Sequence, residues 1–293
     1  MSTQTIELSQ PIPLVVSPKS AYLMCSPRLY DVTYVINPWM TDNLHATSRQ
    51  RALAQWQRLY NALEEIAEIQ LIDPQPGSPD MVFTANAGLE RDGIVVLSHF
   101  FHPERQAEEP YFKQWFQLFG YAVIEVPRET PFEGEGDALF SAAGSRLWAG
   151  YGMRTAKESH RYLERAWNVE TVSLHLVDPR FYHLDTCFAP LSNGYVMYYP
   201  VAFDAVSIAQ IENFYPSHKR IIVSEADATR FACNAINIDR TVLINNVSRE
   251  LSERLNAVGF KVVSLDLSEF LKAGGAAKCL VMKLSKSNPN LAG

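Results

Sequence analysis

The sequence has few cysteines and no paired cysteine motif. Its 293 residues include four cysteines, which lie far apart and never form a C-x-x-C pair. A disulfide framework or a thiolate zinc site needs cysteines that are more numerous or closely spaced, so neither is indicated. We therefore expect four reduced thiols, at Cys25, Cys187, Cys233 and Cys279.

Long hydrophobic runs and clusters of positive charge are also missing. No stretch approaches the roughly 18 consecutive apolar residues of a membrane-spanning helix, and the first residues lack the pattern of a signal peptide. The net charge is −6, and no long basic run is available to bind a phosphate backbone. We expect a cytoplasmic protein that binds a small molecule, with no nucleic acid and no membrane as partner.

Short apolar runs alternate with amphipathic segments along the chain. Apolar residues recur at helical spacing in 45–66 and 108–119. The expected strands lie at 22–26, 82–89, 94–100, 121–126, 146–152, 194–203, 220–224, 241–246, 261–267 and 279–284. This alternation is typical of an α/β fold, and several units look alike.

The chain shows no internal boundary. No linker rich in Pro, Gly or Ser interrupts the alternation, so we expect a single catalytic domain over 1–293. The polar ends, 1–18 and 285–293, are expected to be flexible. The oligomeric state cannot be read from the sequence, and a homo-oligomer is compatible with it.

Four segments place polar residues at the end or in the middle of an apolar run. Burial there is unfavourable for polar groups unless they have partners, so these segments are candidates for a binding site. They are PDMVFTANAG (79–88), FEGEGDALF (132–140), FYHLDTCFAPL (181–191) and GGAAKCLVMKL (274–284). Each segment alone also has a purely structural explanation.

The histidine and the cysteine illustrate these alternatives. His183 is either a core histidine that hydrogen-bonds to the backbone or a catalytic group, and Cys279 is either an inert core thiol or a nucleophile. Asp185 favours the functional interpretation of His183. In a strand, residues i and i+2 point to the same face, so this carboxylate could orient and charge the imidazole.

The acidic segment 132–140 is equally ambiguous. Glu133, Glu135 and Asp137 form either a solvated turn or a buried site for a cationic ligand. The glycines between them permit tight backbone geometry. A thiol, a histidine and several carboxylates together suit nucleophilic attack on a planar cation, because the thiolate attacks, the histidine transfers protons and the carboxylates hold the cation.

With FTAN, EGEGD, HLDT and GG-x-x-x-C in this order, the chain resembles the guanidine-modifying superfamily of arginine deiminases, dimethylargininases and amidinotransferases. The resemblance extends from about residue 22 to 284. It implies a five-bladed, pseudo-symmetric α/β propeller (pentein) built of ββαβ-type units. No metal and no organic cofactor is expected in such an enzyme.

The resemblance also assigns roles to residues. It implies that Cys279 is the nucleophile, that His183 is the general acid and base, and that Glu133 holds the guanidinium group, with Glu135 as the alternative. The further residues expected around the substrate are Asp137, Asp185 and two arginines that would bind its carboxylate group, Arg154 and Arg105.

Two asparagines indicate the arginine dihydrolases within this superfamily. Deiminases carry an aspartate where this chain has Asn86, and an asparagine amide can both accept from arginine and donate to the ureido group of citrulline. Asn37 resembles a second asparagine of the dihydrolases. Both could also be ordinary turn residues. We expect hydrolysis of arginine to ornithine, carbon dioxide and two ammonia, with citrulline as the bound intermediate.

Two other functions remain open from the sequence. The first is a deiminase or dimethylarginine dimethylaminohydrolase that stops at citrulline. The second is a non-enzymatic binding protein with the same propeller fold, which should lack the pair formed by Cys279 and His183.

Overall fold

The computed structural model describes residues 20–285. The ends that we expected to be flexible, 1–18 and 285–293, lie outside the described residues except for Ser285. Among the described residues, no helix combines the length and the apolar character that crossing a membrane requires.

Short strands and helices alternate throughout this range. The strands are β1 (Ala21–Cys25), β2 (Glu68–Ile72), β3 (Gly88–Arg91), β4 (Ile94–Leu97), β5 (Ala122–Glu125), β6 (Ala138–Phe140), β7 (Arg146–Tyr151), β8 (Glu170–His175), β9 (Phe188–Leu191), β10 (Tyr195–Tyr198), β11 (Arg220–Ile222), β12 (Ile236–Ile238), β13 (Thr241–Asn245), β14 (Lys261–Leu265) and β15 (Met282–Leu284). The helices are α1 (Arg49–Glu64), α2 (Pro103–Gln106), α3 (Glu109–Leu118), α4 (His160–Trp167), α5 (Ala205–Phe214), α6 (Glu225–Ala228), α7 (Arg249–Ala257) and α8 (Ser268–Leu271).

The strands form five small sheets of three strands with one shared pattern. The orders are β15-β1-β2, β3-β4-β5, β6-β7-β8, β9-β10-β11 and β12-β13-β14. In each sheet the central strand pairs antiparallel with its first neighbour and parallel with its second. A helix (α1, α3, α4, α5 or α7) connects the two parallel strands, as a parallel pair requires a crossover. The expected mixed α/β fold is confirmed, and the five sheets indicate five repeated units.

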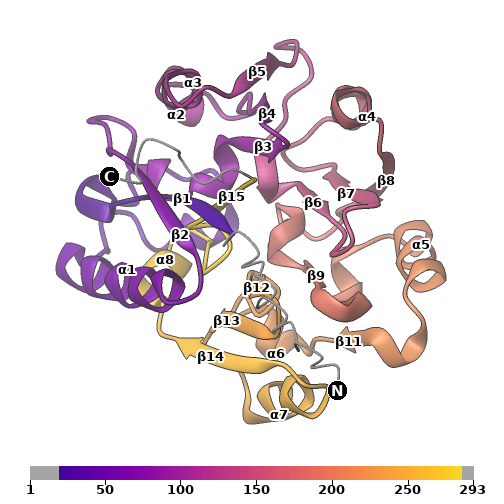
Figure 1. The fold of residues 1–293 in the computed structure, drawn as a ribbon. Coiled ribbons are helices and arrows are strands. Elements are labelled where there is room, and N and C mark those ends of the chain that lie inside the picture. Colours follow the sequence, from indigo (N-terminus) through magenta and orange to yellow (C-terminus); the bar gives the residue numbers. More distant parts are fainter. Residues whose placement is uncertain (1–19, 286–293) are drawn as a thin grey trace, which may run out of the picture.

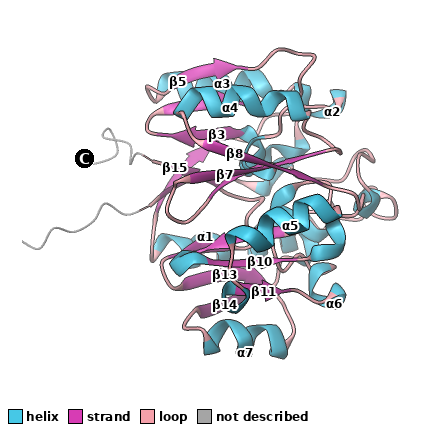
Figure 2. Cartoon of the chain, turned by 90° about the vertical axis from the view of Figure 1, so that its right-hand side faces the viewer, coloured by secondary structure: helices cyan, strands magenta, loops and turns pink. Residues whose placement is uncertain are grey.

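The five sheets follow one another around the molecule, and the connecting helices lie on the outside (Figure 1). In the side view, α4 lies above β8 and α5 lies below it (Figure 2). The first sheet joins both ends of the described chain, because β15 pairs with β1 through Ala21 and Leu284.

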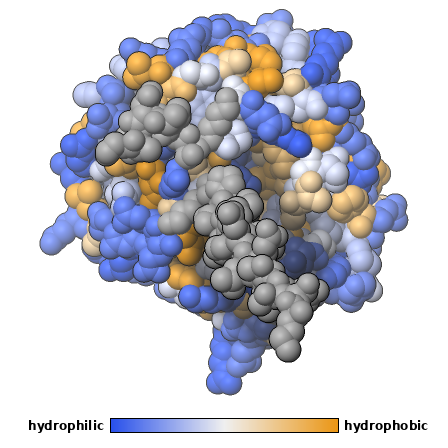
Figure 3. Space-filling view, in the orientation of Figure 1, coloured by the Kyte–Doolittle hydropathy of each residue, from blue (hydrophilic) through white to orange (hydrophobic). Residues whose placement is uncertain are grey.

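Amphipathic helices cover the apolar central strands. Helix α1 begins at an N-cap, where the Ser48 side chain accepts a hydrogen bond from the Arg51 amide, and it buries Trp56, Leu59 and Leu63 on one face. The central strands are buried along most of their length, with Trp148 of β7 fully inside the core. On the face seen in Figure 3, the described residues are mainly hydrophilic, with apolar residues in small groups.

Turns replace much of the expected strands 82–89 and 279–284, and also the strand that we assumed for His183 and Asp185. Residues 82–89 form mainly the 3₁₀ turn Thr84–Ala87 before β3, and 279–284 are a strand only over Met282–Leu284. The 3₁₀ turn Leu184–Thr186 precedes β9, so His183 and Asp185 do not lie on one strand face as we expected. A corresponding turn, Gly134–Gly136, precedes β6. Each motif therefore occupies a turn that leads into the first strand of its sheet.

Candidate active site

The candidate site forms where these turns meet. Asn86, Glu133 and His183 lie in or beside the turns that precede β3, β6 and β9, whereas Asn234 and Cys279 precede β12 and β15. All five side chains are buried. The five units thus each contribute one turn to a common centre, which brings together residues that are up to 193 positions apart in the sequence (279 − 86).

The Cys279 thiol is held by two neighbours. Its Sγ accepts a hydrogen bond from Asn234 Nδ2 at 3.0 Å and donates to Asp185 Oδ2 at 3.4 Å. Asn234 Oδ1 also accepts from the backbone amides of Ala276 and Cys279, both at 3.0 Å. Burial, and then the Asp185 carboxylate, raise the pKa of Cys279 well above its usual range, so the resting group is a thiol.

Backbone conformation and close packing explain why the two residues Gly274 and Gly275 are glycines. Gly274 has a φ of +84°, in the left-handed region that favours glycine. A Cβ on Gly275 would lie 2.7 Å from the Phe83 ring and 3.2 Å from Cys279 Cβ. This loop therefore needs both glycines to pass close to Phe83 and present the thiol.

His183 pairs with Glu133 and not with Asp185. The distance from Nε2 to Glu133 Oε2 is 2.7 Å. The same carboxylate oxygen accepts from Arg154 Nη1 at 3.0 Å, and the Arg154 guanidinium lies 4.6 Å from the centre of the Tyr182 ring. Burial alone would raise the pKa of Glu133, but Arg154 and His183 hold it well below its usual range. Glu133 is therefore an anion that holds two cation-forming groups.

Asp137 supports the turn that carries His183. Its Oδ1 accepts from the Leu184 amide at 3.0 Å, and its Oδ2 accepts from Thr155 Oγ1 at 2.7 Å. Burial raises the pKa of Asp137 to about 6. Asp137 thus acts on the position of the imidazole through the backbone.

Asn86 and Arg105 form a second group. Asn86 Oδ1 accepts from Arg105 Nη1 at 2.8 Å, and Asn86 Nδ2 donates to the Glu133 carbonyl at 3.3 Å. Both carboxylate oxygens of Glu108 hold Arg105, at 2.9 and 2.8 Å. Arg105 is 3% exposed, and its expected role in binding the substrate carboxylate stays a prediction.

Asn37 fixes the loop that faces Cys279. Its Nδ2 donates to the Ala273 carbonyl at 3.0 Å, and its Oδ1 accepts from the Trp39 amide at 3.0 Å. Arg154 Nη2 donates to the neighbouring Ile36 carbonyl at 2.8 Å. These bonds tie segment 36–39 to the glycine loop and to Arg154.

These side chains enclose a cavity that we call the front cavity. It has room for about one water molecule (about 10 Å³). Its lining residues are Ile36, Asn37, Met40, Asp80, Phe83, Asn86, Arg105, Arg154, Tyr182, Ala273 and Cys279. The structure thus brings Cys279, both asparagines and both arginines of the sequence analysis to one cavity. His183 and Glu133 adjoin it through Arg154 and Asn86.

Asn234 is a site residue that no sequence motif predicts, and Glu135, the alternative to Glu133, has other partners. Asn234 stands among apolar and small residues, and only its position before the first strand of its unit marks it. Glu135 Oε2 instead accepts from Lys278 Nζ at 2.6 Å and from the Lys283 amide at 2.9 Å, away from His183.

This geometry can perform nucleophilic chemistry on a cation. A buried thiol, an imidazole and a carboxylate that already holds a guanidinium group adjoin one small cavity. Among residues 20–285, no group of three or more His, Cys, Asp or Glu side chains is arranged to hold a metal ion.

Comparisons with known proteins agree with this chemistry. A family model described as N,N dimethylarginine dimethylhydrolase, eukaryotic, matches residues 33–286. The bifunctional arginine dihydrolase/ornithine cyclodeaminase ArgZ of Synechocystis sp. is 56% identical over 264 residues, which are 90% of this chain and 37% of that protein. The N(G),N(G)-dimethylarginine dimethylaminohydrolase of Mycobacterium tuberculosis is 38% identical over 264 residues, 90% of this chain and 85% of that protein.

A solved structure extends the comparison to the fold. The crystal structure of a variant of the N-terminal domain of ArgZ, covalently bound to a reaction intermediate, has a TM-score of 0.89 at 56% sequence identity. The match covers 90% of this chain and 97% of that domain. This chain therefore spans somewhat over a third of full-length ArgZ and nearly all of its N-terminal domain.

Proposed function

The chain belongs to the N,N-dimethylarginine dimethylhydrolase family, and from this premise we propose that it is an arginine dihydrolase. It converts L-arginine to L-ornithine, carbon dioxide and two ammonia, with citrulline as a bound intermediate. The observation that carries this proposal is the pairing of Glu133 with the guanidinium group of Arg154 beside His183. This pairing is the kind of contact that a substrate guanidinium would need.

Substrate binding rearranges this pair. The substrate guanidinium replaces that of Arg154 on Glu133, and the released Arg154 binds the α-carboxylate of arginine. The front cavity must widen for this step, since it now holds about one water molecule. Tyr182, which faces Arg154, packs against the incoming side chain.

The first hydrolysis uses Cys279 and His183. Cys279 Sγ attacks the guanidinium carbon, one amino group leaves as ammonia with the proton of the thiol, and a covalent thiouronium cation remains. His183, held by Glu133, relays protons to the leaving group and from the attacking water. Hydrolysis then gives citrulline, a free thiol and one proton, so that ammonium is the net product.

The second hydrolysis depends on keeping citrulline in place. Asn86 Nδ2 donates to the ureido oxygen, which an aspartate could not do. A second attack by Cys279 expels another ammonia and leaves a thiocarbamate, and its hydrolysis gives ornithine and carbon dioxide. Arg105, fixed by Glu108, orients Asn86 for this contact.

A dimethylarginine dimethylaminohydrolase is the second candidate. The family model and the relative from Mycobacterium tuberculosis favour it. Such an enzyme would release citrulline and a methylated amine. The identity to ArgZ, at 56% against 38%, favours the dihydrolase.

The architecture belongs to the proposal as well. We infer that the five sheets close into a five-bladed propeller, and that the chain is a single catalytic domain without a metal or an organic cofactor. The pairing of β15 with β1 supports closure, because it joins the last described strand to the first sheet. Five turns that meet at one centre support the single domain.

Product analysis tests the proposed function. Purified protein with L-arginine should form ornithine and two ammonia per arginine, with little free citrulline, as amino-acid chromatography and an ammonia assay would show.

Cys279→Ser should abolish turnover while thermal unfolding stays nearly unchanged, because the hydroxyl is a much weaker nucleophile. Cys233→Ser is the matched control and should remain active. Citrulline as the end product would contradict the dihydrolase, and activity in Cys279→Ser would contradict the covalent mechanism.

A further inference from the structure

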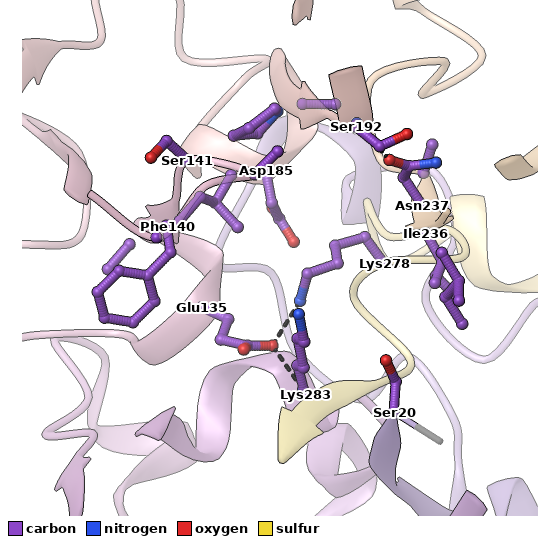
Figure 4. A pocket seen from close by; sticks show the side chains of 18 of the residues that line it. Ser20, Glu135, Phe140, Ser141, Asp185, Ser192, Ile236, Asn237, Lys278 and Lys283 are labelled. Carbon is purple, nitrogen blue, oxygen red and sulfur yellow. Dashed lines mark hydrogen bonds and ion pairs between the residues drawn. The ribbon is translucent and has the colours of Figure 1, made fainter. Parts of the chain in front are cut away.

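A second, larger cavity lies behind Cys279. It has a volume of about 430 Å³ and shares no lining residue with the front cavity. We call it the back cavity. Glu135, Asp185 and Lys278 line its inner part, and their charged groups converge there (Figure 4). Ala142 lies on its wall in the loop between β6 and β7 and is exposed to solvent.

Only a thin wall separates the two cavities. Lys278 lines the back cavity and the next residue, Cys279, lines the front cavity. Asp185 lines the back cavity, and its Oδ2 contacts Cys279 Sγ at 3.4 Å. The other oxygen of this carboxylate, Oδ1, is buried without a hydrogen-bond partner. Asp185 thus connects the reacting sulfur with the back cavity.

We propose that the back cavity is the route by which ammonia leaves Cys279 and water reaches it. This inference rests on the proposed function, which requires ammonia to depart while citrulline stays bound. The front cavity holds about one water molecule before substrate enters, so the bound substrate leaves no passage on that side. The back cavity has room for many waters.

The polar groups at the inner end of the back cavity suit the passage of ammonia and water. The Lys278 ammonium pairs with Glu135 at 2.6 Å, and Asp185 Oδ1 is buried there without a hydrogen-bond partner. This oxygen can accept hydrogen bonds from departing ammonia or ammonium and from entering water. The Lys278 side chain lies at this inner end, and its rotation away from Glu135 would open the passage towards Cys279.

A covalent plug tests the route. Ala142→Cys introduces an exposed thiol on the cavity wall without deleting any side-chain hydrogen bond. A maleimide that carries a polyethylene glycol chain would block the cavity, whereas methyl methanethiosulfonate adds only a methylthio group. Ser217→Cys, exposed and outside both cavities, is the matched control. The unmodified chain treated with the same reagents reports reaction at its four native, buried thiols.

Two readouts are expected to change together. The bulky label on Ala142→Cys should lower kcat for arginine by at least about tenfold with KM nearly constant. It should also slow the oxidation of Cys279 by hydrogen peroxide, followed by mass spectrometry, since this reagent is close to water in size. The small label, and either label on Ser217→Cys, should change neither rate. Unchanged rates in the plugged protein would overturn the proposal. If no form of the protein turns over arginine, the proposed function fails, and the peroxide rate alone then decides the route.

Discussion

At the scale of single residues, Asn234 positions the nucleophile and donates a hydrogen bond to it. Its side-chain oxygen accepts hydrogen bonds from the backbone N–H groups of Ala276 and Cys279, and its side-chain nitrogen donates to the Cys279 sulfur at 3.0 Å. A donor to sulfur favours the thiolate, whereas the nearby Asp185 disfavours it. Burial and Asp185 therefore raise the pKa of Cys279, and the hydrogen bond from Asn234 lowers it.

Asn234→Asp separates these effects. The aspartate keeps an acceptor for the two amides but removes the donor and adds a negative charge, so we expect the pKa of Cys279 to rise further. Alkylation of Cys279 by iodoacetamide should slow by at least about tenfold at pH 8, and its pH profile should move to higher pH. Asn237→Asp, in the following strand, is the control. An unchanged alkylation profile in Asn234→Asp would remove Asn234 from the activation of the thiol.

Asp185 also affects stability in a direction that follows from its pKa. Burial, partly offset by Lys278, raises this pKa from 3.8 to about 7. Between about pH 4 and pH 7 the folded protein therefore holds a proton that the unfolded chain releases, and the free energy of unfolding falls as the pH rises through this window. The lowered pKa of Glu133 acts only at much lower pH.

Asp185→Asn should weaken this dependence. The amide does not titrate, so the loss of unfolding free energy between pH 5 and pH 8 should shrink by about 1 kcal/mol or more. Urea unfolding at the two pH values measures it. Asp137 and Glu108, whose pKa values burial raises to about 6 and about 7, remain and should leave a residual slope of the same sign. An identical slope in both proteins would mean that Asp185 titrates normally.

At the scale of elements, the 3₁₀ turns decide the geometry of the site. The turn Gly134–Gly136 brings its last glycine against two side chains of other turns: a Cβ on Gly136 would lie 2.4 Å from Asn86 Nδ2 and 3.0 Å from His183 Nδ1. The φ of Gly136 is not in the left-handed region, so glycine is required there only because a larger side chain would not fit.

Gly136→Ala should therefore impair catalysis more than stability. The methyl group displaces Asn86 or His183, and we expect kcat for arginine to fall by about a hundredfold, as small displacements of catalytic groups do. Gly120→Ala should instead lower stability without impairing catalysis. Gly120 has a φ of +77° and open space around it, so alanine there should cost about 1 kcal/mol of stability and leave kcat intact. Paired kinetics and thermal melts would reveal the contrast, and equal effects on kcat would refute it.

The sequence predicts the regular elements better than these turns. The central strands β4, β7 and β13 and the helices α1 and α3 fall where apolar periodicity places them. The predicted strands 82–89 and 279–284 include the turn Thr84–Ala87 and the turn at Cys279, because their small and apolar residues continue the hydrophobic run while the backbone turns. For the acidic segment 132–140, a turn was one of the two interpretations. His183 was paired with Asp185 rather than with Glu133, whose approach depends on long-range packing. Asn234 carries no charge and stands among apolar residues, so composition did not mark it.

At the scale of the whole molecule, the pairing of β15 with β1 links the two ends of the described chain. The register joins Ala21 to Leu284 and Leu23 to Met282, and the Lys283 amide also reaches Glu135 in the third sheet. Cys279 lies three residues before β15. Anchoring the last strand therefore also fixes the position of the nucleophile.

A circular permutant tests this arrangement. Gly293 would be joined to Met1, so that no residue is lost, and new ends would be opened between Arg128 and Glu129, both exposed, between the second and third sheets. Because the β15 and β1 pairing survives, we expect the permutant to fold and to retain arginine turnover within about tenfold.

A chain that ends at Val281 keeps Cys279 but lacks β15. It should lose the strand pairing and the contact of Lys283 with Glu135, and therefore unfold at much lower temperature or fail to fold. Circular dichroism melts and the ammonia assay distinguish the two chains. A folded, active chain ending at Val281 would show that neither the first sheet nor the position of Cys279 depends on β15.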